Sequence, residues 1–333
     1  MEELLKVENL KKYFPVNVAS MSHRRKTVDL KAIDGVSFYV NRGETVALVG
    51  ESGSGKSTTA DTILGLYKST AGKIWFRDMD ISTMDIAKRP LSLKKEIQVV
   101  FQDPGTSLNP RRTVGQSLEV PLRVHNMVER GKVSKRAREL LATVGLSAEY
   151  MDKYPRTIGG GERQLVAIAR ALAVHPSLVI LDEPTSALDE SMQAKIITML
   201  VKLQTDLNLS YLFITHNLSL VRNVATRVEI MYLGKIYESA ATLDFFTKPL
   251  HPYTQMLLSS VPVVTEAERK LKPKHIISTG EIPNPVNVPP GCGFCSRCPV
   301  KLKKCSEVEP PSLEVTPGHV VKCFLYDENQ ANG

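Results

Sequence analysis

The chain has 333 residues, of which 42% are hydrophobic and 23% charged, a composition typical of globular proteins. No apolar run approaches the roughly 20 residues of a membrane-spanning helix, and the N-terminal segment MEELLKVENLKK lacks the apolar core of a signal peptide, so we expect a cytoplasmic protein. The net charge of +8 comes partly from basic clusters without an aromatic platform beside them, which argues against a nucleic-acid partner.

The first fifty residues predict short strands. Leu4–Val7 and Lys31–Val40 have the composition of strands, and the basic segment Val16–Leu30 between them predicts an exposed hairpin or loop insertion. Val46–Val49 is a continuous apolar run that stops at Gly50, which is typical of a strand buried on both faces.

A complete P-loop, GESGSGKS at residues 50–57, follows this run. Its glycines allow a tight turn, its backbone N–H groups can wrap a phosphate, and the next helix points its positive end at that phosphate. Lys56 is predicted to reach the β- and γ-phosphates, and the hydroxyl of Ser57 to bind Mg²⁺. The residues predicted to bind the nucleotide here are Gly50, Ser52, Gly53, Ser54, Gly55, Lys56, Ser57 and Thr58.

Strand and helix patterns alternate after the P-loop, which predicts an α/β domain with a largely parallel sheet. The predicted strands are Ile97–Phe101, Leu178–Leu181 and Tyr211–Ile214. The predicted helices are Ser57–Leu66, Ser134–Val144, Gly161–Val174 and Ser191–Leu207.

Two carboxylates follow the strand Leu178–Leu181. Asp182 ends this strand, so its side chain is expected at the carboxyl edge of the sheet, where ligands bind in such folds. It is predicted to hold Mg²⁺ through water. Glu183 is adjacent and is predicted to orient or deprotonate the water that attacks the nucleotide.

The composition changes near residue 240. Residues 249–318 are rich in proline, and all five cysteines lie after residue 291. We therefore expect a domain at 1–240 and a smaller, irregular C-terminal unit at 241–333. The cysteines are Cys292, Cys295, Cys298, Cys305 and Cys323.

Thiols confined to one short tract suggest a metal or cluster site rather than a disulfide framework. Four thiolates suit Zn²⁺ or a 4Fe–4S cluster equally well, and the CxxCxxC spacing at 292–298 is also that of ferredoxin ligands. The spacing leaves cluster, zinc and plain thiols open.

Five motifs in this order resemble the ATP-binding subunit of an ABC transporter. They are GESGSGKST, VVFQDP with Gln102, IGGGERQ, LVILDEPTSALD, and ITHN with His216. Three further segments, FQDPGTSLNPRRTV, HPYTQMLLSSVP at 251–262 and GCGFCSRCP, resemble the oligopeptide/dipeptide importer branch. With these segments the resemblance covers nearly the whole chain.

The resemblance implies a P-loop NTPase (ABC ATPase) fold with a mostly parallel core sheet, a helical signature subdomain at about 103–175 and a small irregular C-terminal domain. It also implies a head-to-tail dimer that encloses two ATP molecules. Gln102 would contact Mg²⁺ or water, His216 would contact the γ-phosphate, and Asp189 would lie on the loop that links the two sites. Tyr13 would stack on adenine, with a core-packed strand aromatic as the alternative.

The signature turn departs from the usual Leu-Ser-Gly-Gly-Gln, because Ile158–Glu162 reads IGGGE. Gly159 replaces the serine whose hydroxyl would donate to the γ-phosphate of the partner, while the backbone N–H groups of Gly160 and Gly161 remain. The loss of one charge-assisted hydrogen bond costs about 1.5–3 kcal/mol. We therefore expect an unlike ATP-binding partner and an active site at this chain's own P-loop.

The resemblance further implies a 4Fe–4S cluster on Cys292, Cys298, Cys305 and Cys323, since some members of this branch carry one. It implies two transmembrane permease subunits, an extracytoplasmic substrate-binding protein and a peripheral position on the cytoplasmic face of the membrane. Peptides are the expected substrates, and oligosaccharides or nickel are the alternatives in this branch. A non-transport ABC ATPase is a second alternative, although such proteins carry coiled-coil insertions or tandem ATPase domains that this sequence lacks.

Overall fold

The structure is a computed structural model that describes residues 2–19, 25–261, 283–286 and 288–327. The chain forms two compact units, each built from segments that are distant in sequence. Unit 1 consists of the described residues of Met1–Leu4, Val40–Thr45 and Asp85–Ile214. Unit 2 consists of those of Leu5–Tyr39, Val46–Met84 and Thr215–Gly333.

Unit 1 contains three parallel strands in the order β8-β7-β6. They are β6 (Ile97–Val100), β7 (Leu178–Asp182) and β8 (Ser210–Thr215). Every residue of β7 and β8 is buried, which explains why these strands are continuous apolar runs. The three strands predicted from such runs are confirmed.

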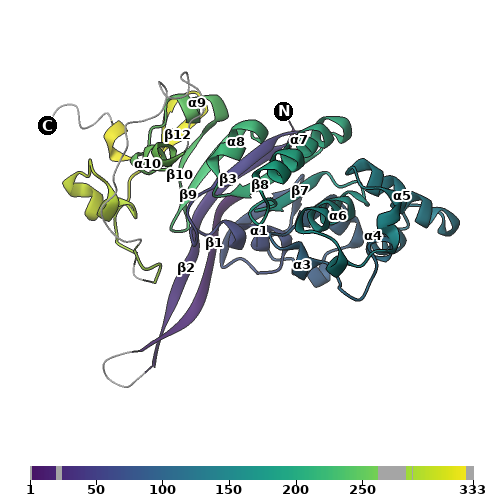
Figure 1. Ribbon diagram of the computed structural model, residues 1–333. Coiled ribbons are helices and arrows are strands. Elements are labelled where there is room, and N and C mark those ends of the chain that lie inside the picture. The colour runs from purple at the N-terminus through teal and green to yellow at the C-terminus, as the bar shows by residue number, and fades with distance from the viewer. Residues whose placement is uncertain (1, 20–24, 262–282, 287, 328–333) are drawn as a thin grey trace. The chain divides into compact units, whose positions relative to one another are not determined.

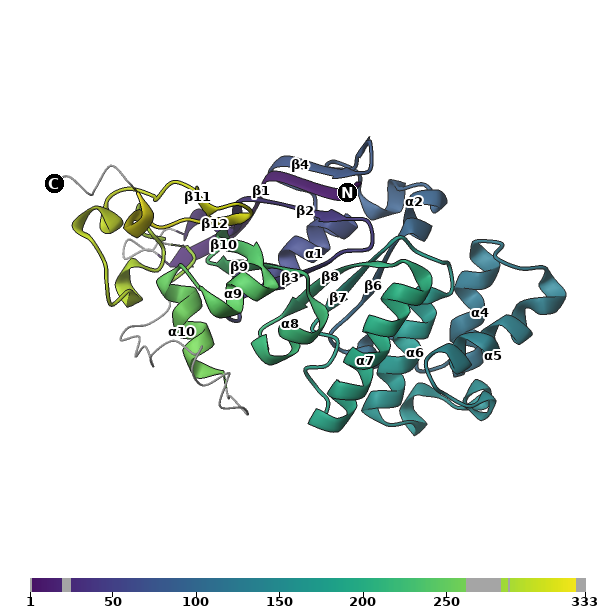
Figure 2. The same ribbon diagram turned by 90° about the horizontal axis from the view of Figure 1, so that it is seen from above.

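Helices follow and precede these strands. They are α2 (Leu91–Glu96), α3 (Pro104–Ser107), α4 (Val114–Val124), α5 (Val133–Thr143), α6 (Gly160–Leu172) and α7 (Glu190–Leu207), with short 3-10 turns at Ile86–Lys88, Arg130–Lys132, Ala148–Asp152 and Pro155–Thr157. The helices α4, α5 and α6 lie beside one another in both views (Figures 1 and 2). A capping box formed by Thr113 and Gln116 fixes the start of α4.

Unit 2 contains an antiparallel sheet in the order β2-β1-β4-β5. Its strands are β1 (Glu3–Ala19), β2 (Arg25–Asn41), β4 (Ala71–Phe76) and β5 (Met79–Asp80). The two long strands β1 and β2 run side by side (Figure 1). They extend into the segment predicted as an exposed hairpin or loop insertion, part of which, residues 20–24, lies outside the described residues.

Unit 2 also contains strands in the order β11-β12-β10-β9-β3. They are β3 (Thr45–Val49), β9 (Arg227–Tyr232), β10 (Lys235–Ala241), β11 (Leu313–Thr316) and β12 (His319–Val321), with helices α1 (Lys56–Leu64), α8 (Leu218–Val224), α9 (Thr242–Thr247) and α10 (Pro252–Ser260) and 3-10 turns at Cys295–Arg297, Lys303–Ser306 and Phe324–Tyr326. β3 is parallel to β9, while β10 pairs antiparallel with both β9 and β12. The C-terminal segment therefore shares a sheet with the strand that leads into the P-loop.

A buried apolar cluster joins these parts of unit 2. It contains Val49 at the end of β3, Tyr232 at the end of β9, Tyr253 of α10, and Cys292 and Phe294 of the C-terminal segment. None of the helices in the part of the chain that the structure describes combines the length and apolar character needed to cross a membrane.

Candidate functional site

The P-loop forms a tight cradle between β3 and α1. Gly53 and Gly55 have φ angles of 78° and 107°, a region that side chains disfavour. A Cβ atom at Gly50 would lie 2.0 Å from the carbonyl oxygen of Met231, and one at Gly55 would lie 2.2 Å from that of Ala32. The loop can adopt this shape only because these positions are glycine.

The side chain of Lys56 folds back over the loop. Its Nζ atom donates to the carbonyl oxygens of Gly50 and Glu51 at 2.7 and 2.9 Å, and it lies 3.4 Å from Oγ of Ser54. Lys56 is only 5% exposed, so these oxygens stabilise a buried ammonium group. A positive charge is thereby fixed inside the loop that is predicted to bind phosphate.

The helix α1 begins at the P-loop and adds its own partial charge. Gly55 is its N-cap and supplies no capping side chain, and the first turn carries no acidic residue. The first N–H groups of this helix therefore suit an anionic ligand. Ser57 is exposed and Thr58 is half-buried at this end of the helix.

In unit 1, the carboxyl end of β7 brings Glu183 and Gln102 together. Asp182 is the last residue of β7 and is 8% exposed. Glu183 follows with a φ of 45°, an uncommon conformation for a residue with a side chain, and its N–H group donates to Ile214 O at 2.9 Å. Nε2 of Gln102 donates to Oε2 of Glu183 at 3.0 Å. This turn fixes the Glu183 carboxylate at the edge of the sheet.

The signature turn lies at the start of α6, also in unit 1. Gly159 is the N-cap of this helix without a side-chain cap. A Cβ atom at Gly159 would lie 2.3 Å from Oε2 of Glu162, so the Glu162 carboxylate occupies the space where a serine side chain would begin. Gly160 has room for a Cβ atom, whereas one at Gly161 would lie 2.6 Å from Cε of Met192.

Asp189 and His216 lie on other loops. Asp189 is the N-cap of α7 and accepts hydrogen bonds from Ser191 Oγ at 2.5 Å and from Met192 N at 2.9 Å. The hydroxyl of Ser191 is the main reason that the pKa of Asp189 is lowered. His216 follows β8 directly and is exposed.

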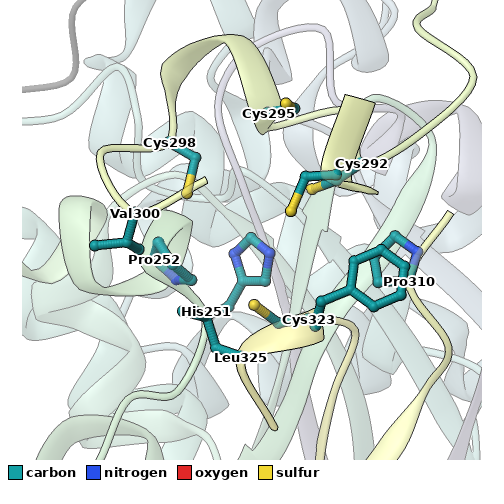
Figure 3. A pocket seen from close by; sticks show the side chains of 11 residues that line it. His251, Pro252, Cys292, Cys295, Cys298, Val300, Pro310, Cys323 and Leu325 are labelled. Carbon is teal, nitrogen blue, oxygen red and sulfur yellow. The ribbon is translucent and has the colours of Figure 1, made fainter. Parts of the chain in front are cut away.

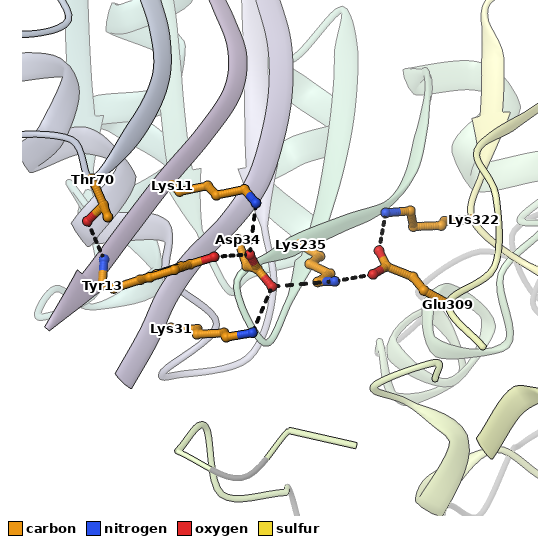
Figure 4. A network of polar contacts seen from close by, with 8 residues as sticks. All are labelled: Lys11, Tyr13, Lys31, Asp34, Thr70, Lys235, Glu309 and Lys322. Atoms are coloured by element: carbon orange, nitrogen blue, oxygen red, sulfur yellow. Dashed lines mark hydrogen bonds and ion pairs between the residues drawn. The ribbon is translucent and has the colours of Figure 1, made fainter. Parts of the chain in front are cut away.

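Tyr13 takes part in a polar network at β1 and β2 (Figure 4). Its hydroxyl donates to Oδ1 of Asp34 at 2.5 Å, and burial together with this carboxylate raises the pKa of Tyr13. Asp34 also pairs with Lys235 at 3.5 Å and with Lys11 and Lys31 at 3.9 Å. The phenol is thus fixed through its hydroxyl group, and stacking of its ring on adenine stays a prediction.

The predicted site residues divide between the two units. Unit 2 holds Tyr13, the P-loop residues 50–58 and His216. Unit 1 holds Gln102, Gly159, Gly160, Gly161, Asp182, Glu183 and Asp189.

The cysteines line a small pocket in unit 2 together with His251 and several apolar side chains (Figure 3). The sulfur atoms of Cys292, Cys298 and Cys323 point toward the middle of this pocket, and Cys295 and Cys305 complete the set of thiols. Its volume is about 10 Å³, which is room for about one water molecule.

This geometry corrects the prediction of an iron–sulfur cluster. Among the residues that the structure describes, no three His, Cys, Asp or Glu side chains are grouped so that they could hold a metal ion. The pocket between the thiols has room for about one water molecule only. The predicted 4Fe–4S cluster on Cys292, Cys298, Cys305 and Cys323 is therefore wrong.

Contacts between the P-loop and the C-terminal segment were not predicted from the sequence. Glu51 contacts Tyr253 and Arg297, which lie more than 200 residues further along the chain. No spacing or periodicity signals such a pair. A charged residue inside the P-loop and an arginine inside the cysteine tract were the only hints available.

Comparisons with known proteins agree with this arrangement. The family model described as "ABC transporter" matches residues 33–186, and the model described as "Oligopeptide/dipeptide transporter, C-terminal region" matches residues 237–305. The oligopeptide transport ATP-binding protein AppF of Bacillus subtilis (strain 168) is 47% identical over 98% of both chains. The dipeptide transport ATP-binding protein DppF of Escherichia coli (strain K12) is 41% identical over 99% of this chain and 96% of its own length.

Solved structures show the same fold. A dimeric ATP-binding cassette in a post-hydrolysis state with ADP and Pi is 28% identical, with a TM-score of 0.60 over 72% of this chain and 98% of that one. An ATP-binding cassette of an ABC transporter in its ADP conformation is 26% identical, with a TM-score of 0.60 over 75% of this chain and 96% of that one. The predicted α/β P-loop NTPase fold and the predicted ATPase activity are thereby confirmed. The chain belongs to the ATP-binding subunits of ABC transporters, in the branch that carries the oligopeptide/dipeptide transporter C-terminal region.

Proposed function

We propose that this chain is the ATP-binding and hydrolysing motor subunit of an ABC importer for dipeptides and oligopeptides. The observation that carries this proposal is similarity over the full length, including the C-terminal region at 237–305, to proteins named for peptide transport. In this proposal residues 1–240 form the ATP-binding domain, and residues 241–333 form the C-terminal extension that is typical of peptide transporters.

ATP binds at the P-loop in this proposal. The glycine cradle, the buried ammonium of Lys56 and the uncapped start of α1 fit a triphosphate, because each offers positive charge or N–H groups where no side chain intrudes. Ser57, Gln102 and Asp182 would hold Mg²⁺, whose oxygen-rich coordination suits a hydroxyl, an amide and a carboxylate. When bound, Mg²⁺ neutralises charge that develops on the phosphates.

Glu183 acts as the general base for hydrolysis. It removes a proton from the water whose oxygen bonds to the γ-phosphorus, while the bond from that phosphorus to the ADP oxygen breaks. The hydrogen bond from Gln102 holds this carboxylate in position. His216 is proposed to contact the γ-phosphate, and Asp189 to lie at the link between the two sites of the dimer.

The partners follow from the same proposal. They are a second, unlike ATP-binding subunit, two transmembrane permease subunits and an extracytoplasmic substrate-binding protein, with this chain at the cytoplasmic face of the membrane. The replacement of the signature serine by Gly159 supports an unlike partner, because this chain's signature turn would serve the weaker of two ATP sites.

Uptake of labelled peptides into proteoliposomes that contain the assembled transporter tests the proposal. We expect dipeptide or oligopeptide uptake that requires ATP and is lost when Lys56→Ala is introduced into this chain. Uptake of an oligosaccharide or of nickel in place of peptides would contradict the peptide assignment. Failure of this chain to copurify with membrane subunits would contradict a transport role.

A further inference from the structure

Arg297 forms a two-pronged ion pair with Glu51 of the P-loop. Its Nη1 and Nη2 atoms donate to Oε2 and Oε1 of Glu51 at 2.6 and 3.0 Å. The Arg297 side chain is 10% exposed and that of Glu51 is 25% exposed, so the pair is largely shielded from water. Arg297 lies in the 3-10 turn Cys295–Arg297, and this contact joins the cysteine tract to the nucleotide loop.

The guanidinium group of Arg297 is held by its surroundings. It lies 5.8 Å from the ring centroid of Tyr232 and 5.6 Å from that of Phe294. Nη1 also donates to the hydroxyl of Tyr232 at 3.3 Å, and Nη2 lies 3.6 Å from the sulfur of Met256. The hydrogen bonds to Glu51 are the main reason that the pKa of Arg297 is raised. Packing thus orients this fork toward Glu51.

The backbone of Glu51 is held by the same region of the chain. Its N–H group donates to the hydroxyl of Tyr253 at 3.0 Å, and Tyr253 is fully buried in α10. Its carbonyl oxygen accepts from Nζ of Lys56 at 2.9 Å. Residues of the C-terminal part of the chain therefore hold both the side chain and the backbone N–H group of Glu51. The carbonyl group of Glu51 in turn contacts Lys56, the lysine that is predicted to bind phosphate.

The negative charge of Glu51 matters for nucleotide binding. The Glu51 carboxylate belongs to a loop whose ligand is a polyanion, and an unpaired carboxylate there repels the ligand. We infer that Arg297 is a positioning residue of the nucleotide site, which acts through Glu51 by neutralising this carboxylate. The inference goes beyond the transport function, because it assigns the C-terminal extension a role in nucleotide affinity.

Binding of ADP with Mg²⁺ to the purified full-length chain, measured by calorimetry, tests this role without hydrolysis. We expect Arg297→Met to raise the Kd for ADP about tenfold, because a charge-assisted pair is lost and a carboxylate is left unpaired beside the ligand. Glu51→Gln alone should change the Kd by less than about twofold. The double variant should return to within about twofold of Glu51→Gln, because no carboxylate then remains to be neutralised.

Two further variants separate this role from general stability. Lys304 pairs with Asp327 in the same C-terminal segment at 3.3 Å, and Lys304→Met is the matched control that should leave ADP binding unchanged. Arg297→Lys keeps the positive charge but loses the two-pronged geometry of the guanidinium group, so it should bind ADP with a Kd between those of the wild type and Arg297→Met. If Arg297→Met fails to fold, Arg297→Lys serves as the test variant. The inference is overturned if the Arg297 variants bind ADP as the wild type does, or if their loss persists in full when Glu51→Gln is added. Absence of peptide uptake by the wild-type transporter, with ADP binding that responds to these variants as expected, would instead count against the transport function alone.

Discussion

Nε2 of Gln102 and Oε2 of Glu183 lie 3.0 Å apart in a hydrogen bond that links the segment after β6 to the end of β7. The two strands are parallel neighbours, so their carboxyl ends meet at the same edge of the sheet. The backbone of Glu183 is strained at a φ of 45°, and its N–H group is tied to Ile214. Both features limit the positions that the carboxylate of Glu183 can take.

Removal of this amide should slow hydrolysis more than it weakens binding. Gln102→Ala is expected to lower kcat of the assembled transporter about tenfold. A correctly placed general base raises the reaction rate about 10²–10⁴-fold, and a misplaced base loses part of that acceleration. The Kd for ADP without Mg²⁺ should change little, because Gln102 is proposed to reach the nucleotide only through Mg²⁺. Phosphate release and calorimetry measure the two effects, and a Gln102→Ala variant with unchanged kcat and weakened ADP binding would contradict the positioning role.

A serine at position 159 tests the proposed weak signature. Because a Cβ atom there meets Glu162, the carboxylate of Glu162 must move, and Gly159→Ser is best combined with Glu162→Gln. Restoring the hydroxyl should raise ATP hydrolysis of the assembled transporter up to about tenfold, since one charge-assisted hydrogen bond is regained. Stability should change by only a few tenths of a kcal/mol, because glycine and serine differ little at an N-cap. Unchanged hydrolysis would count against an asymmetric dimer.

His251 should make the chain sensitive to mild acid. Burial lowers the pKa of His251 to about 4, against the opposing effect of Glu238. Between about pH 6.5 and pH 4 the unfolded chain therefore binds a proton that the folded chain does not bind. From this group alone, the free energy of unfolding should fall by about 1.4 kcal/mol for each unit by which the pH is lowered across this window. Above about pH 6.5 the stability that depends on neutral His251 is fully present.

Urea unfolding at pH 7, 6 and 5 measures this slope. His251→Asn should reduce the dependence of the free energy of unfolding on pH. Nδ1 of His251 accepts a hydrogen bond from the N–H group of Tyr253 at 3.0 Å, and the side chain of asparagine can still accept this bond. Equal slopes in wild type and His251→Asn would contradict the assignment.

The cysteines of the pocket should react slowly. A thiol with a pKa of about 12, as burial gives Cys292, is only about 0.01% ionised at pH 8, and burial also excludes the reagent. Iodoacetamide should modify Cys292 and Cys323 at least about 100-fold more slowly in the folded chain than in guanidinium chloride. Mass spectrometry of the labelled peptides measures both rates. Similar rates in the two states would show that these thiols are accessible and ionised.

Local patterns in the sequence predicted the parts of the site that depend on neighbouring residues. The apolar run at 46–49 became the fully buried strand β3, and Gly53 and Gly55 of the P-loop have the positive φ angles that such a tight turn requires. The run at 178–181 became β7, with Asp182 at its end as expected. In each case the burial or the turn is dictated by a few consecutive residues.

Contacts between distant residues could not be predicted in this way. The pair of Arg297 and Glu51 spans 246 residues, and its geometry depends on how β9, α10 and the cysteine tract pack. The cysteine spacing was compatible with a metal site, but among the described residues no three such side chains are grouped so that they could hold a metal ion. Spacing along the chain fixes neither burial nor the direction in which a side chain points.

ATP hydrolysis at this P-loop is tested most directly by Glu183→Gln in this chain alone, with the partner subunit left as it is. Phosphate release by the assembled transporter should fall to about 1% of the wild-type rate or less, because the general base is lost, while ADP binding to the variant chain stays within about twofold. Retention of half or more of the wild-type hydrolysis would show that the reaction occurs elsewhere and would contradict the assignment of Glu183 as the base.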